Sequence, residues 1–204
     1  MVNYSLNIEF DNKGLGKIRA AGELVVITKT VNSGGASAPV AWVTFQPSQQ
    51  NAVKWSENYQ IYASNSKVQN GAQIVEVSNV KAAAGNSYPF LNSNSFGATT
   101  SSGDPAKYTI ANQDMKKASL TFGLAQDATV NGTQSVNPIN AVSLPSNQTA
   151  VFTPIETIQV FTMANIMGST VIDRVNSNAL TVDLTSAASQ NIKYDDNLNC
   201  FVMA

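Results

Sequence analysis

The sequence contains no histidine, and this absence removes several kinds of chemistry. Among its 204 residues, histidine does not occur and Cys200 is the single cysteine. Histidine is the usual general base, the proton acceptor of Ser-His-Asp and Cys-His systems, and the commonest zinc ligand. Cys200 has no second cysteine to pair with, and its apolar surroundings indicate a buried, inert thiol. We therefore expect a protein that is not an enzyme.

Charge is also scarce. Charged residues make up 12% of the chain, with 12 basic and 13 acidic side chains. Such a composition creates no strong field to collect phosphates, so we expect no nucleic-acid partner. No apolar run approaches the ~20 residues of a membrane helix, and Met1 leads directly into alternating residues without the pattern of a signal peptide. The expectations are no transmembrane segment and a cytoplasmic location.

Alternation of polar and apolar residues predicts strands along most of the chain. Residues 2–10 alternate without interruption, as a half-buried strand does, and residues 23–31 are β-branched as in a strand covered on both sides. Asn131-Gly132 and the segment 195–197 carry hairpin signals. Only residues 14–22 are interpreted as a turn or short helix. The pattern predicts an all-β fold, an antiparallel β-sandwich.

The segment 85–105 lacks strand periodicity and is interpreted as a long central loop or linker. It separates an N-terminal β half, 1–84, from a C-terminal β half, 106–204. Short matches across it, such as Phe45-Gln46-Pro47 with Phe152-Thr153-Pro154, indicate two similar halves produced by an old duplication. Length leaves open whether these halves form one domain or two.

Residues 39–64 contain both tryptophans and predict two strands joined by a turn. Odd positions form an apolar face that includes Trp55, and even positions face water. Two side chains break this pattern, because Glu57 lies in the apolar row and Trp42 in the polar row. A bulge at Glu57-Asn58 would return the carboxylate to water, whereas a buried Glu57 would need a hydrogen-bonding or charged partner.

Large aromatic side chains are the candidates for ligand contact. A ring on a polar sheet face offers apolar area beside hydrogen-bonding neighbours, although packing on a second sheet or on a partner subunit explains Trp42 equally well. Aromatic residues in the long segment 85–105 add to the set, since long loops often carry function. The candidate ligand-binding residues are Trp42, Tyr62, Glu57, Tyr88, Phe90 and Phe96.

The opening strand 2–10, the run 39–64 and the Phe-x-Pro turns at Phe45 and Phe152 together resemble small β proteins of fungal fruiting bodies. This group includes lectins, pore-forming toxins and pink chromoproteins, and size and composition are most similar to the chromoproteins. The resemblance implies a small aromatic chromophore held noncovalently, and a homodimer. It carries over no individual site residue.

Two other binding functions stay open. A lectin would bind glycans with loop Asn and Asp side chains beside Trp42 or Tyr62. A pore-forming protein would insert a Ser/Thr-rich segment such as 85–105 into a membrane as hairpins.

Overall fold

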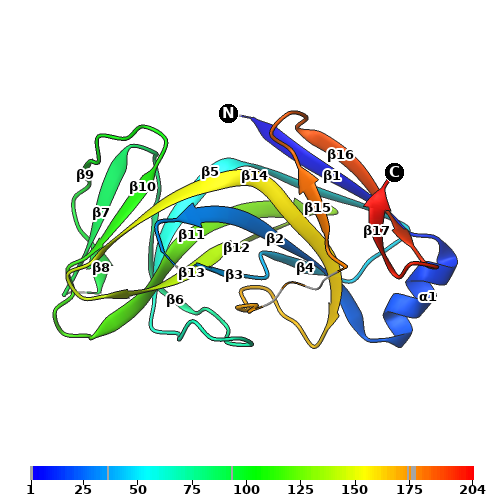
Figure 1. Cartoon of the computed structure of the whole chain (residues 1–204), viewed down its shortest axis with the longest axis horizontal. Helices are drawn as coiled ribbons and strands as arrows, with labels where there is room; N and C mark the ends of the chain where they lie inside the picture. The colour runs from blue at the N-terminus through cyan, green and yellow to red at the C-terminus, as the bar shows by residue number, and fades with distance from the viewer. Residues whose placement is uncertain (1, 36, 93, 174, 176–177) are drawn as a thin grey trace.

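The computed structural model describes residues 2–35, 37–92, 94–173, 175 and 178–204. Its strands form two curled sheets that pack face to face, which confirms the predicted all-β sandwich (Figure 1). Sheet A contains, in spatial order, β17 (Cys200–Met203), β16 (Ser189–Asp195), β1 (Asn3–Glu9), β5 (Gln50–Ser64), β11 (Ser119–Val130), β13 (Asn140–Pro145) and β3 (Ala38–Pro39), with β12 (Thr133–Pro138) on β11 and β6 (Glu76–Lys81) on β5. Sheet B contains β4 (Val43–Phe45), β2 (Glu23–Ser33), β14 (Thr149–Ala164), β10 (Tyr108–Asn112), β7 (Asn86–Leu91) and β8 (Ser95–Phe96), with β15 (Leu180–Asp183) on β14 and β9 (Thr100–Ser101) on β7.

Most neighbouring strands are antiparallel, as predicted, but each sheet also holds a parallel pair. β1 runs parallel to β16 in sheet A, and β7 runs parallel to β10 in sheet B. Polar and apolar side chains alternate identically in strands of either orientation, so the sequence pattern does not reveal these long-range pairings. The β1–β16 pair brings the two ends of the chain together in sheet A.

The two sheets are built on the same plan. Outward from the long strand of each sheet, the order β5, β1, β16, β17 in sheet A matches β14, β10, β7, β8 in sheet B, and β11 and β13 match β2 and β4. Along the chain, the strands β1, β2, β4, β5, β6, β7 and β8 correspond in turn to β10, β11, β13, β14, β15, β16 and β17. We call these two sets the first repeat and the second repeat. Their strands recur at a shift of about 100 residues, which is typical of an internal duplication.

The repeats are interlocked rather than side by side. The first repeat supplies β1, β5 and β6 to sheet A and β2, β4, β7 and β8 to sheet B, and the second repeat divides its strands the opposite way. One hydrophobic cluster accordingly contains residues of both repeats, such as Leu6, Phe90, Phe122 and Phe152. Each sheet and the main core therefore depend on both ends of the chain.

The residue matches that suggested a duplication are not the equivalent positions. Val25 of β2 and Phe122 of β11 are equivalent residues of the two repeats. Val25 pairs with Phe45 of β4, and Phe122 pairs with Val142 of β13. The counterpart of Phe45 is therefore Val142. The similarity of the halves is thus carried by topology and not by the short Phe-x-Pro matches.

The segment 85–105 is not a loop throughout, because it contains β7, β8 and β9. Strand β7 includes Pro89 and is flanked by Gly, Asn and Ser, a composition that normally indicates a turn. Tyr88 and Phe90 nevertheless alternate inward along β7 and are buried. The strand β7 was missed because its turn-like composition outweighed an alternation that is only six residues long.

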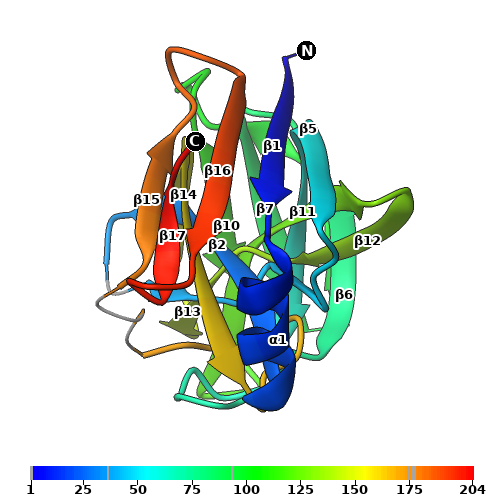
Figure 2. The same ribbon diagram turned by 90° about the vertical axis from the view of Figure 1, so that its right-hand side faces the viewer.

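Helix α1 (Asn12–Ala20) confirms the short helix predicted near residues 14–22. Asp11 begins it as N-cap, with its Oδ1 accepting a hydrogen bond from the Gly14 amide at 2.6 Å. Leu15 and Ile18 face the core, and α1 lies beside the β16–β17 hairpin at one end of the sandwich (Figure 2). No helix in the described ranges has the length and apolar character needed to span a membrane.

Candidate functional site

Four of the predicted ligand-binding aromatics lie in the core. Trp42, Tyr62 and Phe90 are 0% exposed, and Tyr88 is 2% exposed. Strict alternation placed Trp42 and Tyr62 in the row that faces water, and this placement was wrong. Trp42 precedes the short strand β4 instead of lying within a long one, so strict alternation does not govern it. Tyr62 is covered because the outer side of β5 carries a second hydrophobic cluster at this level.

Trp42 packs between the sheets, one of the three environments considered for it. Its ring meets that of Trp55 edge-on at 5.4 Å, and its Nε1 donates to the main-chain oxygen of Gln126 at 3.0 Å. Trp55 is 4% exposed, as predicted for the apolar row.

Glu57 is exposed and lies in a β-bulge. Residues 56–58 of β5 stand opposite Asp127 alone in β11, which confirms the bulge predicted at this point. Glu57 Oε1 accepts a hydrogen bond from the Tyr4 hydroxyl at 2.7 Å, which confirms that this carboxylate has a hydrogen-bonding partner. Burial, together with this carboxylate, raises the pKa of the Tyr4 phenol.

Phe90 and Phe96 are brought together, with ring centroids 5.1 Å apart. The Tyr88 hydroxyl accepts from the Ala83 amide at 2.7 Å, at the same end of the sandwich. Tyr62 belongs to a different hydrophobic cluster from Trp42 and Phe90. The six predicted residues therefore occupy several separate environments.

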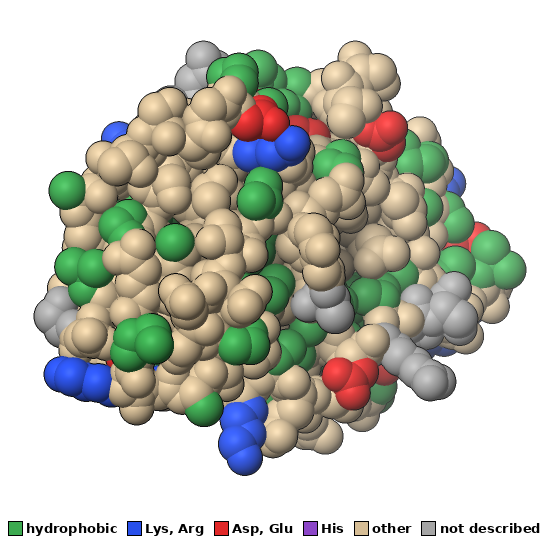
Figure 3. Space-filling view, turned by 60° about the vertical axis from the view of Figure 1, so that its left-hand side comes forward, with side chains coloured by type: hydrophobic (Ala, Val, Ile, Leu, Met, Phe, Trp, Pro, Cys, Tyr) green, Lys and Arg blue, Asp and Glu red, His purple; other side chains and the backbone are tan. Residues whose placement is uncertain are grey.

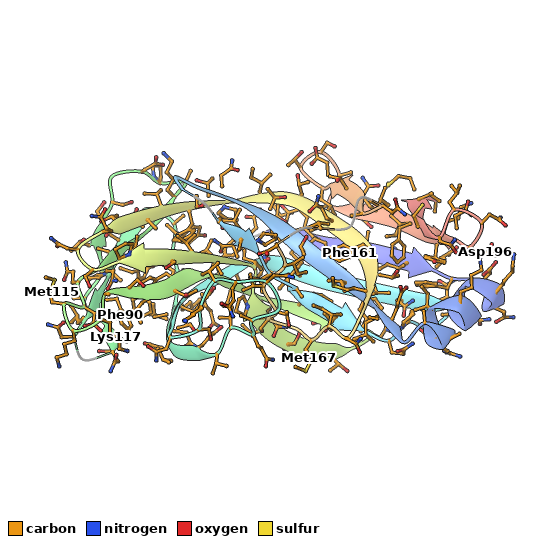
Figure 4. All side chains as sticks on the ribbon, turned by 60° about the horizontal axis from the view of Figure 1, so that its bottom comes forward. Phe90, Met115, Lys117, Phe161, Met167 and Asp196 are labelled. Atoms are coloured by element: carbon orange, nitrogen blue, oxygen red, sulfur yellow. The ribbon has the colours of Figure 1, made fainter. Side chains whose placement is uncertain are left out.

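A cavity of about 490 Å³ opens at the opposite end from Phe90, beside α1. Asp196, labelled in Figure 4, marks this end, where the end of β1, the start of β5 and the β16–β17 turn meet. We call it the α1 cavity. It is lined by Glu9, Phe10, Asp11, Gln49, Gln50, Lys193, Tyr194, Asp195, Asp196 and Asn197.

Aromatic rings form the floor of the α1 cavity. Phe10 and Tyr194 stack with centroids 5.3 Å apart, and Phe201 meets both rings edge-on. Gly14 of α1 lies against Tyr194, where an added Cβ would come within 2.9 Å of the ring. A glycine at this position lets the helix approach the floor closely.

Charged and amide side chains form the rim. Asp196 Oδ2 lies 2.5 Å from Lys13 Nζ, and Lys17 Nζ donates to the Asp196 main-chain oxygen. The hydrogen bond from Lys13 holds the pKa of the Asp196 carboxyl below its ordinary value. Asp195 Oδ1 accepts from the amides of Asn197 and Leu198 at 2.9 and 3.1 Å, so the turn that carries both carboxylates is fixed.

The amides on the opposite side of the rim are also oriented. Gln49 Nε2 donates to Asn12 Oδ1 at 2.7 Å, and Gln50 Nε2 donates to Glu9 Oε1 at 3.2 Å. The rim thus offers both acceptors and donors above an apolar floor. The sequence pattern predicted the turn at 195–197 but not its meeting with Asp11, which depends on the parallel pairing of β1 with β16.

A second polar site is buried between the sheets, where six side chains form what we call the Lys29 cluster. Its members are Lys29, Trp42, Trp55, Tyr59, Gln126 and Glu156. Lys29 Nζ donates to both Glu156 oxygens at 2.7 and 2.8 Å, to the Tyr59 hydroxyl at 3.0 Å and to Gln126 Oε1 at 2.9 Å. The one signal of this cluster in the sequence was a lysine in the middle of the β-branched run 23–31.

Burial governs the titration of this cluster. The Lys29 side chain is 0% exposed, and desolvation lowers its pKa against the opposing effect of Glu156. Desolvation and Glu156 raise the pKa of the Tyr59 phenol.

Within the described ranges, no group of three His, Cys, Asp or Glu side chains is placed to hold a metal ion. Comparison with protein-family models, with curated protein sequences and with solved structures finds no match to this chain.

Proposed function

We propose that this chain is a binding protein that holds a small, hydroxyl-rich ligand of the sugar class in the α1 cavity. The observation that carries the proposal is the rim of fixed carboxylates and amides above the Phe10–Tyr194 floor. Ligand sites commonly combine apolar contact area with a few oriented polar groups, and hydroxyl groups both donate and accept.

The chemistry of the cavity favours a sugar over a flat aromatic pigment. Carboxylates and amides supply most of the lining, and the two floor rings are 5% and 7% exposed. On the face seen in Figure 3, the side chains of Lys, Arg, Asp and Glu are few and scattered. Four carboxylates, in contrast, line the α1 cavity. Four of the five aromatic side chains predicted to contact a ligand are buried in the core.

A glycan array followed by calorimetric titration tests the proposal. We expect binding to at least one common monosaccharide or disaccharide, and a loss of at least about tenfold in affinity for Asp196→Asn, which removes a charged acceptor. An array with no bound glycan, or an unchanged affinity in this variant, contradicts the proposal. A visible absorption band in protein from its native source would instead support the chromophore implied by the resemblance.

A further inference from the structure

In the Lys29 cluster, the lysine amine contacts both the carboxamide of Gln126 and the carboxylate of Glu156. The Lys29 amine is enclosed by aromatic rings, with Nζ 5.7, 6.0 and 5.2 Å from the ring centroids of Trp42, Trp55 and Tyr59. A desolvated lysine gives up its proton more readily, and a neutral lysine amine is a nucleophile. This amine is thus held out of water beside groups with which it can react.

The carboxamide of Gln126 is equally well fixed. Gln126 is 0% exposed, its Nε2 donates to the Ser56 main-chain oxygen at 2.6 Å, and its Oε1 lies 2.9 Å from Lys29 Nζ. The carbonyl carbon bonded to that oxygen therefore lies next to the amine. Groups held in this way react as if at very high concentration, because no encounter or ordering step remains.

Glu156 supplies the group that moves protons. Its two oxygens lie 2.7 and 2.8 Å from Lys29 Nζ, and it also accepts from the Tyr59 hydroxyl at 2.8 Å and from Trp55 Nε1 at 3.1 Å. A carboxylate within hydrogen-bond distance of the nucleophile meets the geometric requirement for general acid–base catalysis.

From this arrangement we propose that Lys29 and Gln126 form an intramolecular isopeptide bond, with Glu156 transferring the protons. Glu156 takes one proton from the Lys29 ammonium, and the neutral amine attacks Cδ of Gln126 while Glu156 protonates the carbonyl oxygen. Glu156 then moves the amine proton to Nε2, the Cδ–Nε2 bond breaks with release of ammonia, and the former carbonyl oxygen returns its proton to Glu156 as the new amide forms. One carbon–nitrogen bond forms, one breaks, and neither oxidant nor reductant is required.

The bond joins strands that the fold brings together from distant parts of the chain. Lys29 lies on β2 in sheet B and belongs to the first repeat, whereas Gln126 lies on β11 in sheet A and belongs to the second. A covalent link at this point ties sheet to sheet and repeat to repeat. It closes a long loop in the unfolded chain and so restricts the unfolded state.

Intact-mass spectrometry of the purified, denatured protein tests the proposal directly. Loss of ammonia lowers the mass by about 17 Da relative to the sequence. Digestion should then release one branched peptide that joins the segments around Lys29 and Gln126. A wild-type protein of full mass, with both segments recovered as linear peptides, overturns the proposal.

Three variants distinguish this bond from other losses of ammonia, such as cyclisation at an asparagine. Lys29→Arg removes the nucleophile and Glu156→Gln removes the proton-transfer group. Each of these variants should therefore have the mass calculated from its own sequence, without the loss of ammonia. Lys54→Arg, at an exposed lysine of β5, should keep the loss of about 17 Da. A loss that persists in Lys29→Arg overturns the proposal. If either buried variant fails to fold, the branched peptide of the wild type decides alone.

Discussion

The two repeats share one plan, and they differ most where equivalent residues meet. Glu57 and Glu156 are the middle residues of the bulges in β5 and β14, and Gln126 and Lys29 lie on the neighbouring strands immediately beyond those bulges. Glu57 turns to solvent and accepts from Tyr4, whereas Glu156 turns inward to Lys29.

The contact between Lys29 and Gln126 explains why the repeats cannot be identical there. These equivalent residues touch at 2.9 Å, so a lysine in both repeats would place two ammonium groups together in the core. Like charges at this distance in a dry interior are strongly unfavourable. Where two equivalent positions of the repeats contact each other in the core, as Lys29 and Gln126 do, a buried lysine is therefore tolerated in only one repeat.

The ends of the sandwich show a second difference. The first repeat inserts α1 between β1 and β2, whereas the second connects β10 to β11 through the short segment 113–118. The ring pairs next to these connections are alike, Phe90 with Phe96 at one end and Tyr194 with Phe201 at the other. The α1 cavity thus lies on an aromatic base that both repeats share, beside a helix that only the first repeat has.

Separating the repeats should have the largest effect. Residues 1–105 alone retain β5 without β11 and β2 without β14, so neither sheet keeps its central pairing. We expect each of the fragments 1–105 and 106–204 to be unfolded as a monomer, and their mixture to recover the two-sheet structure. Amide NMR spectra of each fragment and of the mixture measure this. A monomeric fragment that unfolds cooperatively would refute the interlocked arrangement.

Matched substitutions at the two bulges should show that the equivalent glutamates contribute differently to stability. Glu156→Gln leaves Lys29 buried without its counter-charge, and we expect a loss of about 3–5 kcal/mol in the free energy of unfolding. Glu57→Gln keeps an oxygen that can accept from Tyr4 on an exposed side chain, so the expected change is within about 0.5 kcal/mol. Urea denaturation of both variants makes the comparison. Equal losses would show that the two bulges are energetically alike.

A smaller loss of stability is expected from a substitution beside Tyr62, one of the two equivalent aromatic rings on the long strands. Tyr62 faces Gly123 in sheet A, and Phe161 faces Val26 in sheet B. The Tyr62 hydroxyl donates to the Asn140 main-chain oxygen at 2.6 Å, and a Cβ on Gly123 would lie 2.2 Å from that oxygen. Gly123→Ala should therefore lower stability by about 1–3 kcal/mol.

A glycine-to-alanine substitution in α1, Gly16→Ala, provides the control for this prediction. A Cβ on Gly16 would meet nothing within 4 Å, and alanine is the better helix former, so Gly16→Ala should raise stability by about 0.5–1 kcal/mol. Thermal unfolding of the two variants should show shifts of opposite sign. A Gly123→Ala variant that is as stable as the wild type, or more stable, would contradict the packing described around Tyr62.

The smallest effect concerns the ion pair on the rim of the α1 cavity. The pKa of Asp196 is lowered from 3.8, so its contribution to stability is present above that value and is lost as the pH falls through the lower folded pKa. The pKa of Lys13 is raised from 10.5, so its contribution is present below that value and is lost as the pH rises through the higher folded pKa. Carboxyl NMR titration should show the pKa of Asp196 rising toward 3.8 in Lys13→Met. An unchanged value would remove Lys13 as the cause.

Local patterns predicted much of this fold. The alternation of residues 2–10 predicted β1, and the odd positions of β5 identified the buried Val53, Trp55, Tyr59 and Ile61. The Asn131-Gly132 signal lies in the β11–β12 turn, where both residues have positive φ. These features depend on neighbours in the sequence, and so the sequence alone could reveal them.

The candidate sites were harder to predict because they depend on distant pairing. Asp11 and Asp196 share a cavity only because β1 and β16 lie side by side, and Lys29 meets Gln126 only because the sheets stack. Nothing local to Trp42 specifies that its indole reaches the main chain of β11. Sequence periodicity identifies which side chains are buried more readily than it identifies which of them meet.

We propose that the ligand binds in the α1 cavity and not at the equivalent place in the second repeat. Gln49 and Gln148 precede β5 and β14 at matching positions, and both are exposed. Calorimetric titration of Gln49→Ala and Gln148→Ala with the sugar selected by the array compares the two ends directly. We expect an affinity at least about fivefold weaker for Gln49→Ala and unchanged for Gln148→Ala. Equal affinities in the two variants, or weaker binding in Gln148→Ala alone, would contradict it.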